Sequence, residues 1–162
     1  FHRDPEGNQP AHPELRDGEG HMILWDRLSE TTLERKVPFL KAEFGNPLTI
    51  LPRRIFVPRP VKANPSIAGG CEVAKMDAEV ANSLTLLVRG TCTFGLKAKT
   101  LMQRRAGAFG LINTDGEPFP MQVDEEEIKF LTIEAITIGA ADGAFITNKV
   151  LNEGMELWAR FV

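Results

Sequence analysis

The run Leu84–Val88 (LTLLV) is the feature that most constrains the fold of this chain. It is almost continuously apolar and is bounded by Asn82-Ser83 and Arg89-Gly90. A strand with one solvated face alternates between apolar and polar residues, whereas a continuous run indicates a strand buried on both faces. We therefore expect a central strand in a sheet that is covered on both sides.

The residues after this run predict a helix and then a second strand. Apolar side chains recur at helical spacing, and cationic and amide side chains occupy the other side. The apolar positions are Phe94, Ala98, Leu101 and Met102, and the polar ones are Lys97, Lys99, Gln103, Arg104 and Arg105. Gly107 is expected to end the helix in a left-handed cap, and Phe109–Asn113 is expected to be the next strand. The unit is thus strand, helix and strand, with the two strands parallel.

The region before this unit predicts mostly strands. Met22–Leu28 and Val37–Phe44 are expected to pair across a Ser/Glu/Thr turn. Leu48–Leu51 and Ile55–Val57 are separated by Pro52, which suits edge strands or extended coil because proline donates no ladder hydrogen bond. Residues 58–70 are rich in proline and glycine and are expected to form a loop.

The region after the unit predicts a strand, a helix and a last strand. Thr132–Ile138 is rich in β-branched residues, which favours a strand. The expected helix buries Ala141, Ala144, Phe145 and Leu151, ends at Gly154 and leads into a strand at Met155–Val162, while Ile146 and Val150 fall outside its buried face. The acidic run Asp124–Glu127 is interpreted as solvated surface.

Length and composition indicate one domain. The chain has 162 residues, 43% of them hydrophobic, which suffices for one ordinary core. Residues 1–20 are rich in proline, glycine and charge and are predicted to be a flexible leader, so the domain is expected to span 21–162. We interpret the chain as a processed or excised segment.

Charge and hydropathy argue against two kinds of partner. The net charge is −3 and the basic residues are dispersed, so a nucleic-acid partner is not expected. No apolar run approaches the length needed to cross a bilayer, so we expect no membrane insertion by this segment.

The two cysteines, Cys71 and Cys92, are compatible with one disulfide, although their spacing alone does not settle whether they pair. A bridge would close a loop of about 22 residues and contribute about 3 kcal/mol. It would also indicate an oxidising compartment. Alternatively, Cys92 at a helix start could be a thiolate of low pKa.

Catalytic and metal sites find little support in the sequence. A nucleophile requires a nearby base, but His2, His12 and His21 all lie in or beside the expected leader. The same histidines could hold a metal, although nothing fixes their geometry. Asp115 and Glu117 could form an acid and base pair, but carboxylates in turns are usually solvated. We therefore expect no enzyme activity, no catalytic residue, no metal and no cofactor.

The stretch Leu84–Asn113 (LTLLVRGTCTFGLKAKTLMQRRAGAFGLIN) resembles the central motif of protease-associated (PA) domains. In that motif an apolar strand, Arg-Gly, a Cys-Thr-Phe loop, a basic helix and Ala-Gly-Ala precede an apolar strand that ends in Asn. Upstream, Gly70-Cys71 is similar to the family's Gly-Cys, and downstream the segment TIEAITIGAADGAFI is similar to its strand, Asp-Gly and helix. At Glu134-Ala135 many relatives carry Pro and a small residue. The layout is similar to small secreted PA-domain proteins and to the PA segments of vacuolar sorting receptors and membrane-anchored RING ubiquitin ligases.

The resemblance implies a fold, a disulfide and a binding loop. The fold is α+β, an open β-barrel or sandwich-like sheet flanked by two or three α-helices, and Cys71 pairs with Cys92. The implied setting is secreted or in the lumen of the endomembrane system. In the sorting receptors the loop after the central strand contacts cargo peptide. The candidate ligand-binding residues here are Arg89, Gly90, Thr91, Cys92 and Thr93, together with Asn113.

The chemistry of this loop suits a polypeptide ligand. Gly90 permits close backbone approach, Arg89 can make bidentate contacts, and the helix N-terminus beyond carries N–H groups that favour a carboxylate or carbonyl. The alternative is structural: Gly90 makes a tight turn, Phe94 packs in the core and Arg89 pairs with a surface acid. Similarly, the basic helix face could meet an acidic partner, but such faces are usually just solvated.

Two functions remain open from the sequence. In one, the domain binds or presents polypeptide. In the other, it is a structural or regulatory appendage that controls substrate access to a protease or another enzyme outside this chain.

Overall fold

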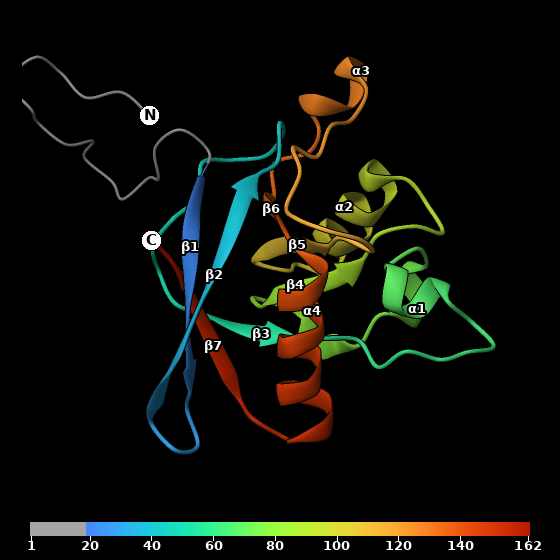
Figure 1. Cartoon of the computed structure of the whole chain (residues 1–162). Coiled ribbons are helices and arrows are strands. Elements are labelled where there is room, and N and C mark those ends of the chain that lie inside the picture. The colour runs from blue at the N-terminus through green and yellow to red at the C-terminus, as the bar shows by residue number, and fades with distance from the viewer. Residues whose placement is uncertain (1–18) are drawn as a thin grey trace, which may run out of the picture.

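A computed structural model describes residues 19–162, which form a seven-stranded barrel with helices on its outside (Figure 1). The first eighteen residues of the expected leader lie outside the described residues, and β1 begins at Glu19, three residues before the strand predicted from Met22. The α+β prediction of a barrel-like sheet flanked by helices is confirmed. The strands are β1 (Glu19–Asp26), β2 (Thr31–Lys41), β3 (Arg53–Phe56), β4 (Leu84–Val88), β5 (Ala108–Ile112), β6 (Glu134–Ile138) and β7 (Leu157–Phe161).

Two longer helices and several short ones complete the described region. The longer helices are α2 (Phe94–Gln103) and α4 (Ala140–Thr147), and α4 continues into a π-helical turn at Asn148–Asn152. The one-turn helices are α1 (Ser66–Gly69) and α3 (Glu125–Ile128), and two 3-10 turns lie at Val73–Lys75 and Ala78–Val80. No helix among residues 19–162 is both long and apolar enough to span a bilayer.

The barrel is closed, whereas the resemblance implies an open barrel or a sandwich-like sheet. Its strand order is β1-β2-β6-β5-β4-β3-β7, and the ring closes because β1 pairs antiparallel with both β2 and β7. Closure removes the free edges along which other strands could add. The pairing of the first two strands across a turn is as expected.

The predicted strand, helix and strand unit is confirmed. Strands β4 and β5 are parallel, with Leu84 opposite Ala108, and β6 continues the parallel set. Inside-facing residues of these strands, such as Leu86 and Ile136, join a cluster within the barrel. Outward-facing residues, such as Leu87 and Phe109, join a second cluster beneath α2. The continuous apolar run of β4 is therefore explained by burial on both faces.

Helix α2 ends differently from the prediction. The residue in the left-handed region is Arg105, with φ of 60°, and not Gly107. Glycine is needed at 107 for a different reason: a Cβ there would lie 2.1 Å from Arg53 Nη1 and 3.0 Å from the Asn82 carbonyl oxygen. Close packing against two neighbouring segments therefore replaces the expected cap.

The buried face of α4 also differs from the prediction. Gly143 and Ile146 are buried, whereas Ala141 and Ala144, which we expected inside, are exposed. A Cβ on Gly143 would lie 2.2 Å from Ile112 Cγ2, so the helix approaches β5 at this glycine. A pattern based on apolar side chains alone misses a contact made by a glycine. Gly154, with φ of 68°, lies in the turn after the helix as expected.

The segment Leu48–Leu51 is not a strand. Glu134, at the start of β6, is buried and accepts a hydrogen bond from the Thr49 backbone N–H at 3.0 Å. The same carboxylate forms a 2.8 Å ion pair with Arg53. Glu134 thus holds this segment as extended coil against the barrel.

Candidate functional site

The disulfide between Cys71 and Cys92 is present, with an S–S distance of 2.05 Å. It joins the segment after α1 to the loop between β4 and α2, and it closes a sequence separation of 21 residues. The pairing implied by the resemblance is confirmed. A thiolate role for Cys92 is excluded in this structure because its sulfur is bonded.

The loop after β4 has an unusual backbone. Gly90 and Thr91 both have positive φ, at 106° and 72°. No heavy atom lies within 4 Å of a Cβ built on Gly90, so glycine is required there by the backbone angle and not by crowding. Positive φ is unfavourable for a β-branched residue such as Thr91, so neighbouring structure must hold it. The disulfide at the next residue is one such restraint.

Lys97 is the second restraint. Its side chain is fully buried, and its ammonium donates hydrogen bonds to the carbonyl oxygens of Gly69 (2.7 Å), Val88 (2.8 Å) and Gly90 (2.7 Å). These carbonyls belong to α1, to the end of β4 and to the loop. Lys97 therefore ties together the same two segments as the disulfide.

The prediction of a solvated basic helix face is wrong at Lys97. The signal that could have identified it is its spacing, since Lys97 lies three residues after Phe94 and four before Leu101, on the buried face of the helix. Burial lowers the pKa of Lys97 from its ordinary 10.5 to about 8. Arg104 is also engaged, because it donates to the carbonyl oxygens of Val73 and Met76 at 3.0 and 2.9 Å.

Arg89 projects from the start of the loop and is exposed. Its guanidinium lies 4.3 Å from the centroid of the Phe119 ring and 5.7 Å from that of Phe94. Its Nη1 donates to Asn113 Oδ1 at 3.2 Å. Among the described residues its partners are thus two aromatic rings and an amide, not the surface acid of the structural alternative. In this position the guanidinium retains further N–H groups that can donate hydrogen bonds to a ligand.

Asn113 has a supporting place beside the loop. It is buried, its Oδ1 accepts from Arg89, and its Nδ2 donates to the Glu117 carbonyl oxygen at 2.8 Å. Its side-chain groups are therefore occupied by the protein. Asn113 orients Arg89 rather than lining the pocket.

The N-terminus of α2 carries a carboxylate that the sequence did not suggest. Thr93 caps the helix, with its side-chain oxygen accepting from the Leu96 N–H at 3.1 Å. The carboxylate of Glu127, from α3, lies against Gly95, where an added Cβ would be 2.0 Å from Oε2. Glu127 also pairs with Lys99 at 3.4 Å. The acidic run is therefore solvated surface only in part, because Glu127 occupies the positive end of the helix dipole.

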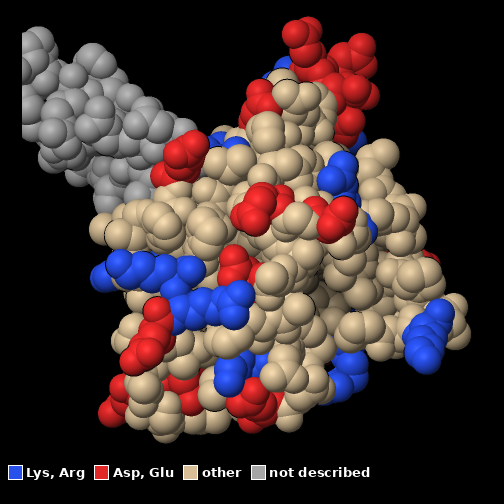
Figure 2. Space-filling view, in the orientation of Figure 1, with Lys and Arg blue, Asp and Glu red and all other residues tan. Residues whose placement is uncertain are grey.

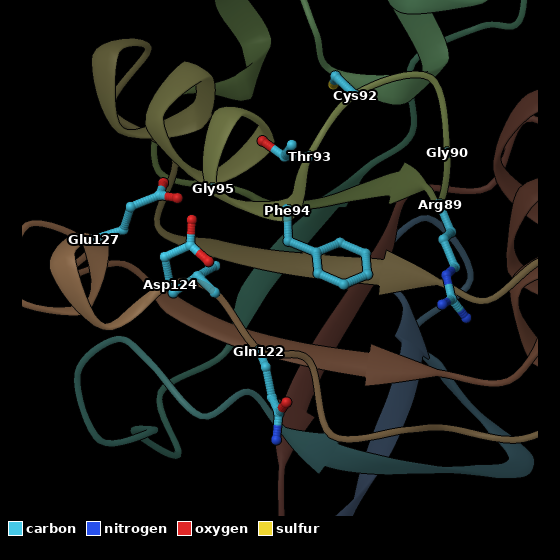
Figure 3. Close-up of a pocket in the computed structure, with 10 residues that line it drawn as sticks. Arg89, Gly90, Cys92, Thr93, Phe94, Gly95, Gln122, Asp124 and Glu127 are labelled. Carbon is cyan, nitrogen blue, oxygen red and sulfur yellow. The ribbon is translucent and has the colours of Figure 1, made fainter.

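These elements enclose a pocket of about 400 Å³ (Figure 3). Arg89 lies at one end, Asp124 and Glu127 lie at the other, and the Phe94 ring lies between them. Figure 2 shows acidic side chains gathered at the tip of the molecule formed by α3. The pocket is thus cationic at one end and anionic at the other. Its lining residues are Arg89, Gly90, Cys92, Thr93, Phe94, Gly95, Gln122, Val123, Asp124 and Glu127.

Four of the predicted loop residues, Arg89, Gly90, Cys92 and Thr93, line this pocket. Thr91 instead lines a neighbouring hollow with Val61 and Val88, and Arg89 lies between the two hollows. A continuous surface therefore runs across the loop, from the acidic end of the pocket to this apolar hollow.

The residues considered for catalysis do not converge on the pocket. Asp115 and Glu117 are exposed and are not among its lining residues. His21 lies on β1, while His2 and His12 fall outside the described residues. Within residues 19–162, no group of three or more His, Cys, Asp or Glu side chains is arranged to hold a metal.

At the level of fold, the barrel with its tethered loop is PA-like. The same fold occurs in a zinc aminopeptidase from Bacillus subtilis (TM-score 0.60, 17% identity), where the match covers 92% of this chain and 31% of that one. It also occurs in an aminopeptidase from Aneurinibacillus sp. strain AM-1 (TM-score 0.56, 14% identity), where the match covers 88% of this chain and 31% of the aminopeptidase. A peptidase M28 precursor from Shewanella amazonensis gives a TM-score of 0.50 at 13% identity, and the match covers 88% of this chain and 34% of the precursor.

The chain spans about a third of the length of these structures, so its fold recurs as one region of larger peptidases. No protein-family model and no curated protein sequence matches the chain. At these sequence identities the structural similarity shows a shared fold.

Proposed function

We propose that this chain is a non-catalytic PA-like domain that binds or presents polypeptide through the pocket beside the loop of residues 89–93. The observation that carries the proposal is the double restraint of this loop by the disulfide and by Lys97, which holds Gly90 and Thr91 at positive φ. Two restraints on an exposed loop preorganise it and so lower the entropic cost of binding. The disulfide also supports a secreted or lumenal setting.

The charge pattern of the pocket supports an extended peptide as ligand. An isolated anion would be attracted to Arg89 but repelled by Asp124 and Glu127. An isolated cation would be attracted to the two carboxylates but repelled by Arg89. A peptide carries carbonyl oxygens for the guanidinium and a terminal amine or basic side chain for the carboxylates. The apolar hollow near Val61 and Val88 adds room for an uncharged side chain.

Selection of short linear peptides from a display library, followed by calorimetry on synthetic peptides, tests this proposal. Arg89→Glu is expected to weaken binding by about tenfold or more. Lys36→Glu is the matched control, because it makes the same charge change at an exposed site on β2. Equal binding of selected peptides by the wild type and Arg89→Glu, with both proteins folded, would contradict the proposal.

The second candidate, an appendage that controls access to an enzyme, draws support from the peptidase neighbours. They carry this fold as about a third of their chains. The complete reading frame decides between the two candidates. A peptidase signature in it favours the appendage, whereas a transmembrane segment with a RING or sorting tail favours a receptor.

A further inference from the structure

Both tryptophans of the chain lie side by side on the outer face of the barrel, away from the loop site. Trp25 on β1 is directly opposite Trp158 on β7, and their ring centroids are 6.0 Å apart at an angle of 46°. Leu157 and Ala159 point into the core, so Trp158 between them points outward. β1 and β7 lie on the other side of the barrel from α1 and α2 (Figure 1).

The indoles form part of a hollow of about 320 Å³. Both rings are only partly buried, although outward positions on a solvated barrel usually carry polar side chains. Polar side chains lie beside them: the Glu30 carboxylate accepts hydrogen bonds, the Arg160 guanidinium donates them, and the Thr32 hydroxyl can do either. The hollow therefore offers two indole rings, tilted by 46° to each other, and hydrogen-bonding side chains at its exposed rim.

The Trp158 ring is held in place before any ligand arrives. Its indole Nε1 donates to Glu156 Oε2 at 3.1 Å, and the guanidinium of Arg27 lies 5.9 Å from the ring centroid. Arg27 and Glu156 also pair with each other at 3.4 Å. An aromatic platform fixed in this way loses little side-chain entropy on binding.

We propose that the hollow beside Trp25 and Trp158 binds a neutral oligosaccharide. A pyranose ring presents a face of C–H groups, which suits the negative face of an indole, and a rim of hydroxyl groups, which suits Glu30, Thr32 and Arg160. The volume is at the lower end of the range for small-molecule sites and fits one or two sugar rings.

A peptide strand fits this hollow less well than a sugar. β1 is paired with β2 and β7, and β7 is paired with β1 and β3, so neither strand has a free edge to which a peptide could add. Recognition at this place depends on side chains alone. The sugar site is independent of the proposed peptide site.

The chain itself provides the assay, because it contains two tryptophans and no tyrosine. Tryptophan emission therefore reports on this hollow only. Titration of the protein with cellohexaose, chitohexaose and maltohexaose is expected to give a saturable change in emission for at least one of them. Absence of a saturable change up to low-millimolar concentration for all three would overturn the proposal.

Variants locate the binding. By calorimetry, Trp158→Ala is expected to lower the affinity for the responding oligosaccharide by about tenfold. Trp25→Phe keeps an aromatic face and is expected to change that affinity by less than about threefold. If Trp158→Ala fails to fold, Glu30→Gln combined with Thr32→Val tests the exposed rim and is expected to weaken binding by about fivefold. Unchanged affinity in the folded variants overturns the site.

Two controls distinguish a sugar site in this hollow from binding at the loop pocket and from binding of a protein partner. Arg89→Glu is expected to leave oligosaccharide affinity unchanged, because residue 89 lines the other pocket. A proline-rich peptide is titrated in parallel, since proline also stacks on aromatic rings. A response to that peptide and to none of the sugars would assign the hollow to a protein partner and overturn the proposal.

Discussion

The ammonium of Lys97 lies 2.7 Å from the carbonyl oxygen of Gly69, although the two residues are 28 positions apart in the sequence. Gly69 is two residues before Cys71, and Lys97 is five residues after Cys92, so this hydrogen bond runs beside the disulfide. The two links differ in chemistry. One responds to reduction and the other to the protonation of an amine.

Removal of the Lys97 ammonium is expected to destabilise the protein. Lys97→Met keeps an apolar stem but leaves three buried or partly buried carbonyl groups without their donor, which costs about 3 kcal/mol in the free energy of unfolding. Denaturation by urea measures this loss. Lys99→Met on the same helix is the control, because Lys99 is half exposed and its ion pair with Glu127 is worth less than about 1 kcal/mol. Equal losses in the two variants would contradict the role of Lys97.

The stability of the protein is expected to rise with pH through the alkaline range because of Lys97. Its pKa in the folded protein is about 8, and its ordinary value is 10.5. Between these two values the unfolded chain holds a proton that the folded chain has released, so raising the pH favours the folded state. The advantage of the wild type over Lys97→Met, measured by urea denaturation, should therefore grow from pH 8 to pH 10.5. Lys41, whose pKa burial also lowers, is common to both proteins. A constant or shrinking difference would contradict the effect of burial on the pKa.

Loss of the disulfide is expected to weaken both the fold and the loop site. The double variant Cys71→Ser and Cys92→Ser should lower the free energy of unfolding by about 3 kcal/mol, from the loop-closure entropy that the bridge removes from the unfolded chain. Thr91 is then free to leave its positive φ, so selected peptides should bind more weakly even at temperatures where the variant is folded. Calorimetry below the thermal midpoint measures this. Full peptide affinity in the folded double variant would show that Lys97 alone preorganises the loop.

Gly143→Ala is expected to destabilise the protein, against the usual preference of helices for alanine. The added Cβ would lie 2.2 Å from Ile112 Cγ2 and would push α4 away from β5. Overpacking of this kind costs about 1–3 kcal/mol. Ala144→Ser, at the exposed neighbouring position, is the control and should change stability by less than about 0.5 kcal/mol. A stabilised Gly143→Ala protein would place the helix on the face that the apolar pattern predicted.

The parts of the fold that the sequence predicted correctly are those whose signals are local. The run Leu84–Val88 indicates burial on both faces by itself, and the spacing of Phe94, Ala98 and Leu101 indicates a helix. Barrel closure is not local, because it depends on β1 meeting β7 across almost the whole chain. Neither strand carries a pattern that distinguishes an open edge from a paired one.

The sequence predicts the site as a loop but not the restraints that hold it. The resemblance identifies residues 89–93, and the structure places four of them around one pocket. Lys97 and Lys99 have the same kind of side chain on the same helix, and what buries the first is a set of carbonyls from elsewhere in the fold. The sequence does not distinguish Glu127 from its acidic neighbours either, because its contact with Gly95 joins residues that are 32 positions apart.

Mapping backbone amide resonances of isotope-labelled protein during titration with a selected peptide shows whether the restrained loop is the face that receives polypeptide. We expect the largest shifts on the amides of Gly90, Thr93 and Gly95, while the indole resonances of Trp25 and Trp158 stay in place. Shifts concentrated elsewhere on the barrel, with the amides of residues 89–95 unmoved, would contradict it.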